Sequence, residues 1–173
     1  MTDRRQFFAT LWGLTEPKEV VKKEATPFRP LLPGFVPKAE NGCDTCESSA
    51  CKLACPQGIV IRHDKSIPYL DFSQRGCAFC GDCQRACDHD CFSAGEHKHV
   101  QARVTIDAKH CLAWNHTICR SCADACNERA IAFTGLWQPV INSDACTACG
   151  FCVGKCPSDT IKLQPLMPRV EVA

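Results

Sequence analysis

The sequence predicts an α+β protein made of two tandem modules, each with short helices and short antiparallel strands. Three observations lead to this prediction. The cysteines fall into four groups of four, the first cysteines of successive groups stand 34, 34 and 35 residues apart, and short apolar runs follow the groups. So regular a period indicates one supersecondary unit used four times. Apolar runs bounded by turn residues are typical of strands.

The spacing of the cysteines indicates a cofactor. The second and fourth quartets read C-x2-C-x2-C-x3-C, and the first and third each widen one gap. This is the ligation pattern of a [4Fe-4S] cluster. In chain order, the predicted ligands are Cys43, Cys46, Cys51 and Cys55; Cys77, Cys80, Cys83 and Cys87; Cys111, Cys119, Cys122 and Cys126; and Cys146, Cys149, Cys152 and Cys156. The sequence therefore predicts four [4Fe-4S] clusters in two ferredoxin-like modules, each of which binds two.

The fourth cysteine of each quartet is expected to serve a neighbouring cluster. Three cysteines on a tight turn can reach three corners of one cubane, whereas the fourth begins a helical turn that carries it away. We expect Cys87 to join the first three cysteines of quartet one and Cys55 to join those of quartet two. Likewise, Cys156 would join quartet three and Cys126 quartet four. Nested pairing, of the first quartet with the fourth and the second with the third, is the alternative, but adjacent pairing closes the shorter loops.

Other uses of so many cysteines fit the sequence less well. A disulfide scaffold needs an oxidising compartment, and no cleavable signal stands at the N-terminus. Zinc sites use C-x2-C pairs with long spacers, whereas Cys77–Cys87 packs four cysteines into 11 residues. The net charge of +1 indicates no nucleic-acid partner. No apolar run approaches the roughly 20 residues of a membrane span.

Residues 1–40 are expected to precede the modules. Arg4 and Arg5 resemble the start of a twin-arginine export signal, but the apolar stretch is short and charged residues follow at once. We therefore expect a retained segment in a cytoplasmic protein. One face of a short predicted helix carries Phe7, Phe8, Leu11 and Trp12. This face either covers the chain's own cluster module, docks a partner protein or binds a membrane surface.

The prolines and apolar runs predict the remaining elements. Residues 26–37, which hold four prolines, are expected to form an extended linker rather than a packed element. Module one is predicted at 41–103, module two at 104–165 and a C-terminal tail at 166–173. The strands are predicted at 58–61, 67–72, 104–107, 130–133, 139–142 and 160–163. The polar segment 88–103 is expected to form the loop between the modules.

Three residues in or beside this loop could carry chemistry of their own. Cys91 follows Cys87 by four positions. It is either a buried small apolar residue, a substitute ligand or a redox-reactive thiol. His97 and His99 could suggest a metal site, but histidines in a polar loop are more often solvated.

The widened third quartet contains polar and aromatic residues. His110 and His116 lie on either side of Cys111 and are expected to donate hydrogen bonds to cluster sulfur, which would tune the reduction potential. Trp114 and Trp137 are expected to cover the clusters of module two. We find no Gly-rich phosphate loop and no nucleophile apart from the ligand set, so no enzyme is expected.

Four features of the sequence occur together: the order of the quartets, the third quartet CLAWNHTICRSCADAC, the following AIAF and GLWQPVINSDACTACGFC, and the N-terminal RRQFF. With these features the chain resembles the NapF family, the ferredoxin-type accessory proteins of periplasmic nitrate reductase systems. The resemblance covers the chain from residue 1 to about residue 165. It implies a cytoplasmic protein that binds the catalytic molybdenum subunit of nitrate reductase before export. Such a protein would assist maturation of that subunit by helping to supply or reduce its iron–sulfur cluster.

Two functions remain open at this stage. The first is binding and assembly of the nitrate reductase precursor, which rests on the resemblance and on the N-terminal segment. The second is plain electron transfer, in which single electrons pass along the clusters between redox enzymes. The second function would not depend on the N-terminal segment. The widened first quartet is expected to hold the more labile cluster.

Overall fold

The structure is a computed structural model that describes residues 28–36 and 42–166. Its helices are α2 (Ala50–Leu53), α3 (Asp82–Arg85) and α4 (Ser121–Asp124), and its strands are β1 (Val60–Ile61), β2 (Tyr69–Leu70), β3 (Ala102–Ile106), β4 (Ile131–Thr134), β5 (Gln138–Ile141) and β6 (Ile161–Pro165). The α+β class with short elements is therefore confirmed. The predicted helix that would carry Phe7 and Trp12 lies outside the described residues.

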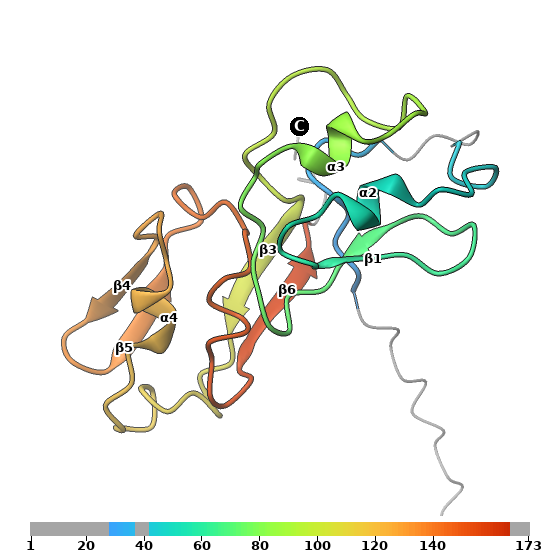
Figure 1. Cartoon of the computed structure of the whole chain (residues 1–173). Coiled ribbons are helices and arrows are strands. Elements are labelled where there is room, and N and C mark those ends of the chain that lie inside the picture. Colours follow the sequence, from blue (N-terminus) through green and yellow to red (C-terminus); the bar gives the residue numbers. More distant parts are fainter. Residues whose placement is uncertain (1–27, 37–41, 167–173) are drawn as a thin grey trace, which may run out of the picture.

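The strands pair as three antiparallel ribbons. β1 and β2 form a hairpin, as do β4 and β5, while β3 pairs with β6 from the far end of the chain. Each predicted strand segment contains or overlaps one of these strands. Lys65 and Gly135 adopt positive φ in the two hairpin turns, the conformation that tight turns require. In Figure 1, β3 and β6 lie in the centre, with β4 and β5 on one side and β1, α2 and α3 on the other.

The three helices have the same place in the repeat. Each has four residues, contains the third cysteine of its quartet and ends before the fourth. A helix this short is not stable alone in water, so packing must hold it. Its single turn separates the last two cysteines of each of these quartets and directs them to different sides.

The prediction that residues 26–37 form an unpacked linker is wrong for the described part of that segment. Leu32 is only 3% exposed and Phe35 is also buried. The Phe35 ring packs edge-on against Phe92, with 5.6 Å between centroids, and the Val36 N–H donates to the Cys91 carbonyl at 2.9 Å. Leu32 and Phe35 therefore belong to the same core as Val60, Leu70 and Phe72.

The segment 88–103 is largely irregular, as predicted, but its ends are packed. Phe92 forms an isolated β-bridge with Phe35, and Val100 is fully buried. Residues 102 and 103 already belong to β3. The polar middle of the segment therefore runs between two anchored ends.

The two halves of the chain contact each other through the second and fourth quartets. The Cys77 N–H donates to the Cys149 carbonyl at 2.7 Å. Beside this bond, Phe72 packs on Gly150, where an added Cβ would lie 2.3 Å from the ring. Gly150 has a φ of 82°, so both the backbone conformation and the close approach require glycine.

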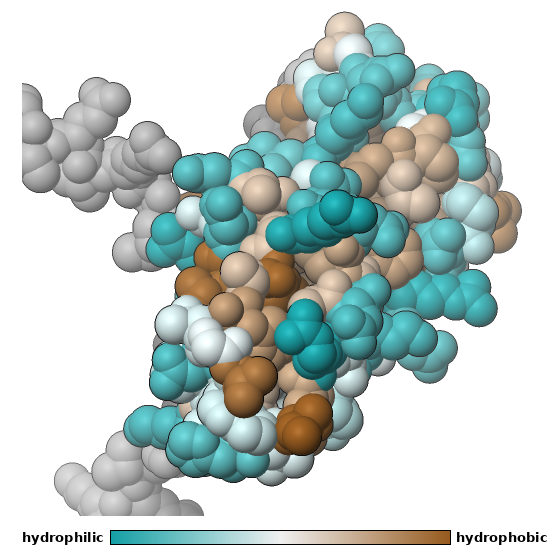
Figure 2. Space-filling view, turned by 90° about the vertical axis from the view of Figure 1, so that its left-hand side faces the viewer, coloured by the Kyte–Doolittle hydropathy of each residue, from teal (hydrophilic) through white to brown (hydrophobic). Residues whose placement is uncertain are grey.

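Some large apolar side chains remain exposed. In the second half they include Ile118, Leu136 and Val140. The face on the side of β4 and β5 shows apolar side chains set among hydrophilic ones (Figure 2). Scattered apolar residues are normal on a protein surface.

The packing of residues 28–36 can be tested with a matched pair of leucines. Leu32→Ala is expected to destabilise the iron-loaded chain by about 2–5 kcal/mol, because it removes buried methyl groups. Leu53, which is 79% exposed, serves as the control, and Leu53→Ala should stay within about 0.5 kcal/mol. The measurement is the apparent midpoint of thermal unfolding under anaerobic conditions. Equal midpoints for the two variants would mean that residues 28–36 do not stabilise the core and act as a linker.

Candidate iron–sulfur centres

The cysteines of the four quartets gather around four cavities. The first cavity is lined by Cys43, Cys46, Cys51 and Cys87, the second by Cys55, Cys77, Cys80 and Cys83, the third by Cys126, Cys146, Cys149 and Cys152, and the fourth by Cys111, Cys119, Cys122 and Cys156. Every cavity takes three cysteines from one quartet and the fourth from the adjacent quartet. This is the grouping expected from adjacent pairing and not from nested pairing. Ligation of iron by these cysteines stays a prediction.

Local backbone conformation turns neighbouring cysteines toward the same cavity. Phe79 and Ala148 have φ values of 52° and 54°, and each stands directly before the second cysteine of its quartet. A positive φ is costly for residues other than glycine and persists only where the surroundings hold it. The Phe79 N–H in turn lies 3.4 Å from the Cys77 sulfur, to which it donates. Two quartets thus use the same strained turn to present their thiols.

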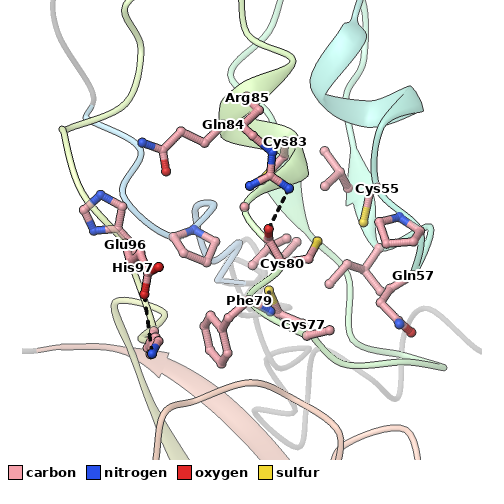
Figure 3. A pocket seen from close by; sticks show the side chains of 18 of the residues that line it. Cys55, Gln57, Cys77, Phe79, Cys80, Cys83, Gln84, Arg85, Glu96 and His97 are labelled. Atoms are coloured by element: carbon pink, nitrogen blue, oxygen red, sulfur yellow. Dashed lines mark hydrogen bonds and ion pairs between the residues drawn. The ribbon is translucent and has the colours of Figure 1, made fainter.

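The four cavities differ in size. The first, third and fourth have volumes of only about 20, 10 and 10 Å³, because side chains pack closely around them, whereas the second has about 700 Å³. Figure 3 shows Cys55 approaching the second cavity from one side while Cys77, Cys80 and Cys83 line the other. Cys80 is exposed. The second cavity is therefore the one with the freest access from solvent.

The donor set fits a [4Fe-4S] cluster. Each cavity presents four predicted ligand thiols, which is the usual ligand set of a cubane, and the first cavity also presents the thiol of Cys91. Within residues 28–36 and 42–166, no three His, Cys, Asp or Glu side chains converge closely enough to hold a single metal ion. A cubane needs the wider spacing, because each thiolate binds a different corner iron.

Burial affects the protonation of the thiols in the iron-free chain. It raises the pKa of Cys77 to about 11 and that of Cys83 to about 12. Burial likewise raises the pKa of Cys122 to about 11 and that of Cys152 to about 12. These side chains are neutral thiols at neutral pH, so binding of iron must displace their protons.

Hydrogen bonds reach the cysteine sulfurs mainly from the backbone and from hydroxyl groups. The Ala130 N–H donates to the Cys126 sulfur at 3.3 Å, and the Thr160 N–H donates to the Cys156 sulfur at 3.4 Å. The Thr160 hydroxyl also lies 3.3 Å from the Cys156 sulfur. Hydrogen bonds to sulfur are one of the determinants of cluster potential. Both donors stand four residues after the cysteine, where the chain turns into the next strand.

The predicted role of the histidines in the third quartet is wrong. His110 Nδ1 lies 2.7 Å from Asp107 Oδ2, and His116 packs edge-on against Trp137. Both histidines are exposed, and neither hydrogen-bonds to a cysteine sulfur in the described part of the chain. Asp107, which follows β3, and Trp137, which precedes β5, hold these side chains at the surface.

The predicted aromatic cover of the second-half cavities is also wrong. Trp114 donates from Nε1 to the Pro139 carbonyl at 3.3 Å and so ties the quartet to β5. Neither Trp114 nor Trp137 is among the residues that line the third and fourth cavities. Aliphatic side chains such as Ile106 and Ile161 line the fourth cavity instead.

Cys91 lies at the first cavity together with four predicted ligands. It is 3% exposed, and its sulfur is 4.0 Å from that of Cys43. Its burial agrees with a small apolar residue, and its position agrees equally with a substitute ligand. In the adjoining loop, His97 bonds to Ser93 and His99 is exposed, so these two histidines do not form a metal pair.

Sequence reasoning missed Arg62 at the first cavity. Arg62 follows β1 directly, is 7% exposed and donates from Nη1 to the Cys46 sulfur at 3.2 Å. Hydrogen bonds with Ser48 and Arg62 lower the pKa of the Cys46 thiol to about 7, against the opposing effect of burial. The available signal was a charged residue directly after the apolar run 58–61.

Comparison with known proteins identifies relatives that are ferredoxin-type proteins. The family model described as "4Fe-4S binding domain" matches residues 139–162. The chain is 33% identical over 150 residues to the ferredoxin-type protein NapF of Escherichia coli strain K12, which covers 84% of this chain and 89% of that protein. It is 33% identical over 128 residues to NapF of Haemophilus influenzae, with coverage of 72% and 71%.

A more distant relative has a different name. The methylamine utilization ferredoxin-type protein MauM of Methylophilus methylotrophus is 27% identical over 172 residues, covering 85% of this chain and 73% of that protein. Among the described residues, no helix has the length and apolar character needed to cross a membrane.

The role of Cys91 can be tested by a single substitution. Cys91→Ala is expected to keep the iron and acid-labile sulfide content of the unsubstituted chain, because Cys43, Cys46, Cys51 and Cys87 already supply four thiolates. Cys87→Ala is the control and should lower both contents. If Cys91→Ala loses as much iron as Cys87→Ala, Cys91 is itself a ligand.

Proposed function

Because the chain belongs to the NapF family of ferredoxin-type proteins, we propose that it is a carrier of four [4Fe-4S] clusters that acts on the catalytic molybdenum subunit of periplasmic nitrate reductase. The observation that carries the cluster count is the gathering of sixteen cysteines around four cavities. The two cavities in each half correspond to one two-cluster ferredoxin-like module, with the modules at 41–103 and 104–165.

The ligands of each cluster are the four cysteines that line its cavity. When bound, a [4Fe-4S] cluster accepts and releases single electrons. The chain itself holds the thiolates in place, excludes water from the fourth cavity with aliphatic walls, and donates hydrogen bonds to sulfur, as Thr160 does to Cys156. None of these tasks needs an acid, a base or a nucleophile, so we propose no enzymatic activity.

An assembly role is supported by the family and by the N-terminal sequence. The twin-arginine-like Arg4-Arg5 and the apolar residues after it would provide a docking segment in a cytoplasmic protein. The partner would be the nitrate reductase catalytic subunit in its precursor form, before export. The chain would assist its maturation by helping to supply or reduce the iron–sulfur cluster of that subunit.

Plain electron transfer is the second candidate, and one contact favours it. The hydrogen bond from Cys77 to Cys149 joins the second and third cavities. The exchange of the fourth cysteine joins the first cavity to the second and the third to the fourth. The four cavities therefore form a continuous series, and exposed Cys80 gives a partner access to the second cavity.

Double substitutions test the proposed ligand sets. Cys46→Ala with Cys87→Ala removes two ligands of one proposed cluster and is expected to lower iron and sulfide by about a quarter. Cys46→Ala with Cys156→Ala removes one ligand from each of two clusters and should lower them by about half. Nested pairing requires the opposite order of the two losses.

Anaerobic capture of partners tests the assembly role. Tagged full-length chain, made together with the signal-bearing nitrate reductase catalytic subunit, is expected to recover that subunit. Chain lacking residues 1–25 is expected to recover it at no more than background, because the proposed docking segment is gone. The control is equal iron content in both forms.

Other outcomes of the capture experiment would change the proposed docking site or the proposed function. Recovery by both forms would move docking onto the cluster modules, and Leu136→Ser would then test the exposed face beside β4 and β5. If neither form recovers the subunit but both accept electrons from a redox enzyme, the chain is an electron carrier.

A further inference from the structure

We propose that Arg62 is the charge partner of the cluster held by Cys43, Cys46, Cys51 and Cys87. The inference rests on the proposed ligand set of the first cavity and goes beyond it. Arg62 would make reduction of this one cluster easier, and it would also hold the widened first quartet in its ligating form.

The guanidinium group of Arg62 uses all of its hydrogen-bonding capacity, with four bonds to the first quartet and one to its own hairpin. Its Nη2 donates to the carbonyls of Cys43 and Cys46 at 2.5 and 3.0 Å. Its Nη1 donates to the Cys46 sulfur at 3.2 Å and to the Ser49 hydroxyl at 3.0 Å, and its Nε donates to the Ser66 carbonyl at 3.1 Å. Arginine has five N–H donors in a fixed fork, and these five bonds account for them.

Four of these bonds end on the first quartet. The first quartet has four residues, rather than two, between its second and third cysteines. Ser49 lies within this gap, and Cys43 and Cys46 precede it. Ser49 has a φ of 49°, an uncommon conformation for serine. Arg62 therefore braces the irregular part of the quartet from the neighbouring hairpin.

The charge of Arg62 has no carboxylate partner in the described part of the chain. No ion pair includes it there, and it is the only charged residue among the buried ones described. A buried cation is unfavourable unless a negative charge compensates it. The negative charge available at this site is that of the cysteine thiolates and the cluster they would hold.

The other cavities lack an equivalent group. At the second cavity, Arg85 pairs with Asp82 and Lys98 pairs with Glu96, and all four side chains reach solvent. The third and fourth cavities are lined by no lysine or arginine. Arg85 donates to the Cys80 carbonyl, but its charge is paired and solvated, so the effect of a buried guanidinium without a carboxylate partner should be confined to the first cavity.

The direction of the effect follows from charge. One electron from an external donor adds one negative charge beside a fixed positive charge, so the guanidinium stabilises the reduced form more than the oxidised form. Burial limits screening by solvent and salt. Removal of the charge should therefore lower the reduction potential of this cluster and leave the other potentials unchanged.

Two variants separate charge from hydrogen bonding. Arg62→Gln keeps N–H donors without the charge, and Arg62→Lys keeps the charge without the fork. Arg103→Met, which removes an exposed charge on β3, is the control. The iron-loaded chains are titrated anaerobically with dithionite and followed by electron paramagnetic resonance. The signal of the first cavity is the one that Cys46→Ala with Cys87→Ala abolishes.

The expected result is a shift in Arg62→Gln alone. At a fixed solution potential the reduced fraction of the first-cavity cluster, relative to its oxidised fraction, should fall by about tenfold or more. Arg62→Lys and Arg103→Met should leave it near that of the unsubstituted chain. Loss of the first-cavity signal in Arg62→Gln but not in Arg62→Lys also supports a charge partner.

Three results would overturn the inference. They are an unchanged first-cavity potential in Arg62→Gln, an equal shift in Arg62→Gln and Arg62→Lys, and loss of the signal in both. In each case the proposed ligand set of the first cavity remains supported if Cys46→Ala with Cys87→Ala abolishes one paramagnetic resonance signal. If that variant abolishes no signal, the ligand set itself is wrong, and the inference about Arg62 falls with it.

Discussion

The convergence of cysteines from two adjacent quartets on one cavity is the constraint on which the rest of the structure depends. The strands have two to five residues and the helices four, and such short elements are not stable alone. Each quartet shares its cavities with the adjacent quartet, so its position depends on that neighbour. Metal bound there would add its binding free energy to folding. This is why a small apolar core is sufficient.

The two halves of the chain differ in the contact that joins the segment before the first quartet of the half to the segment after its second quartet. The second half closes with the β3–β6 ladder, which pairs five residues on each strand. In the first half the corresponding contact is reduced to the single bridge between Phe35 and Phe92. Arg62 adds polar contacts to the first quartet, in which the gap between the second and third cysteines is widened. The β3–β6 ladder provides regular backbone hydrogen bonds, whereas the buried guanidinium of Arg62 provides both hydrogen bonds and a positive charge. The cavities of the first half therefore differ electrostatically from those of the second half, although both halves have the same grouping of cysteines.

Several features were predictable and others were not, for reasons visible in particular residues. The strand segments were found because short apolar runs next to turn residues depend on local preference. The packing of Leu32 and Phe35 was not predicted because the four prolines of residues 26–37 indicated an extended linker. The structure shows that these two apolar side chains are buried in the core. His110 and His116 were assigned to the sulfurs because they are close to Cys111 in sequence. In the structure they contact Asp107 and Trp137 instead of sulfur, and closeness to Cys111 in sequence does not reveal that choice of partner.

The sequence by itself determined the type and number of candidate ligands, the α+β class and the resemblance to a ferredoxin-type family, because cysteine spacing acts within a single turn and the repeat follows from the order of residues. Only the tertiary structure decided which fourth cysteine joins which quartet, that Cys77 contacts Cys149, and that Arg62 lies against Cys46. These contacts join residues that are 16 to 72 positions apart. Their formation depends on how helices, hairpins and glycine-limited close contacts pack together, and no local spacing encodes that packing.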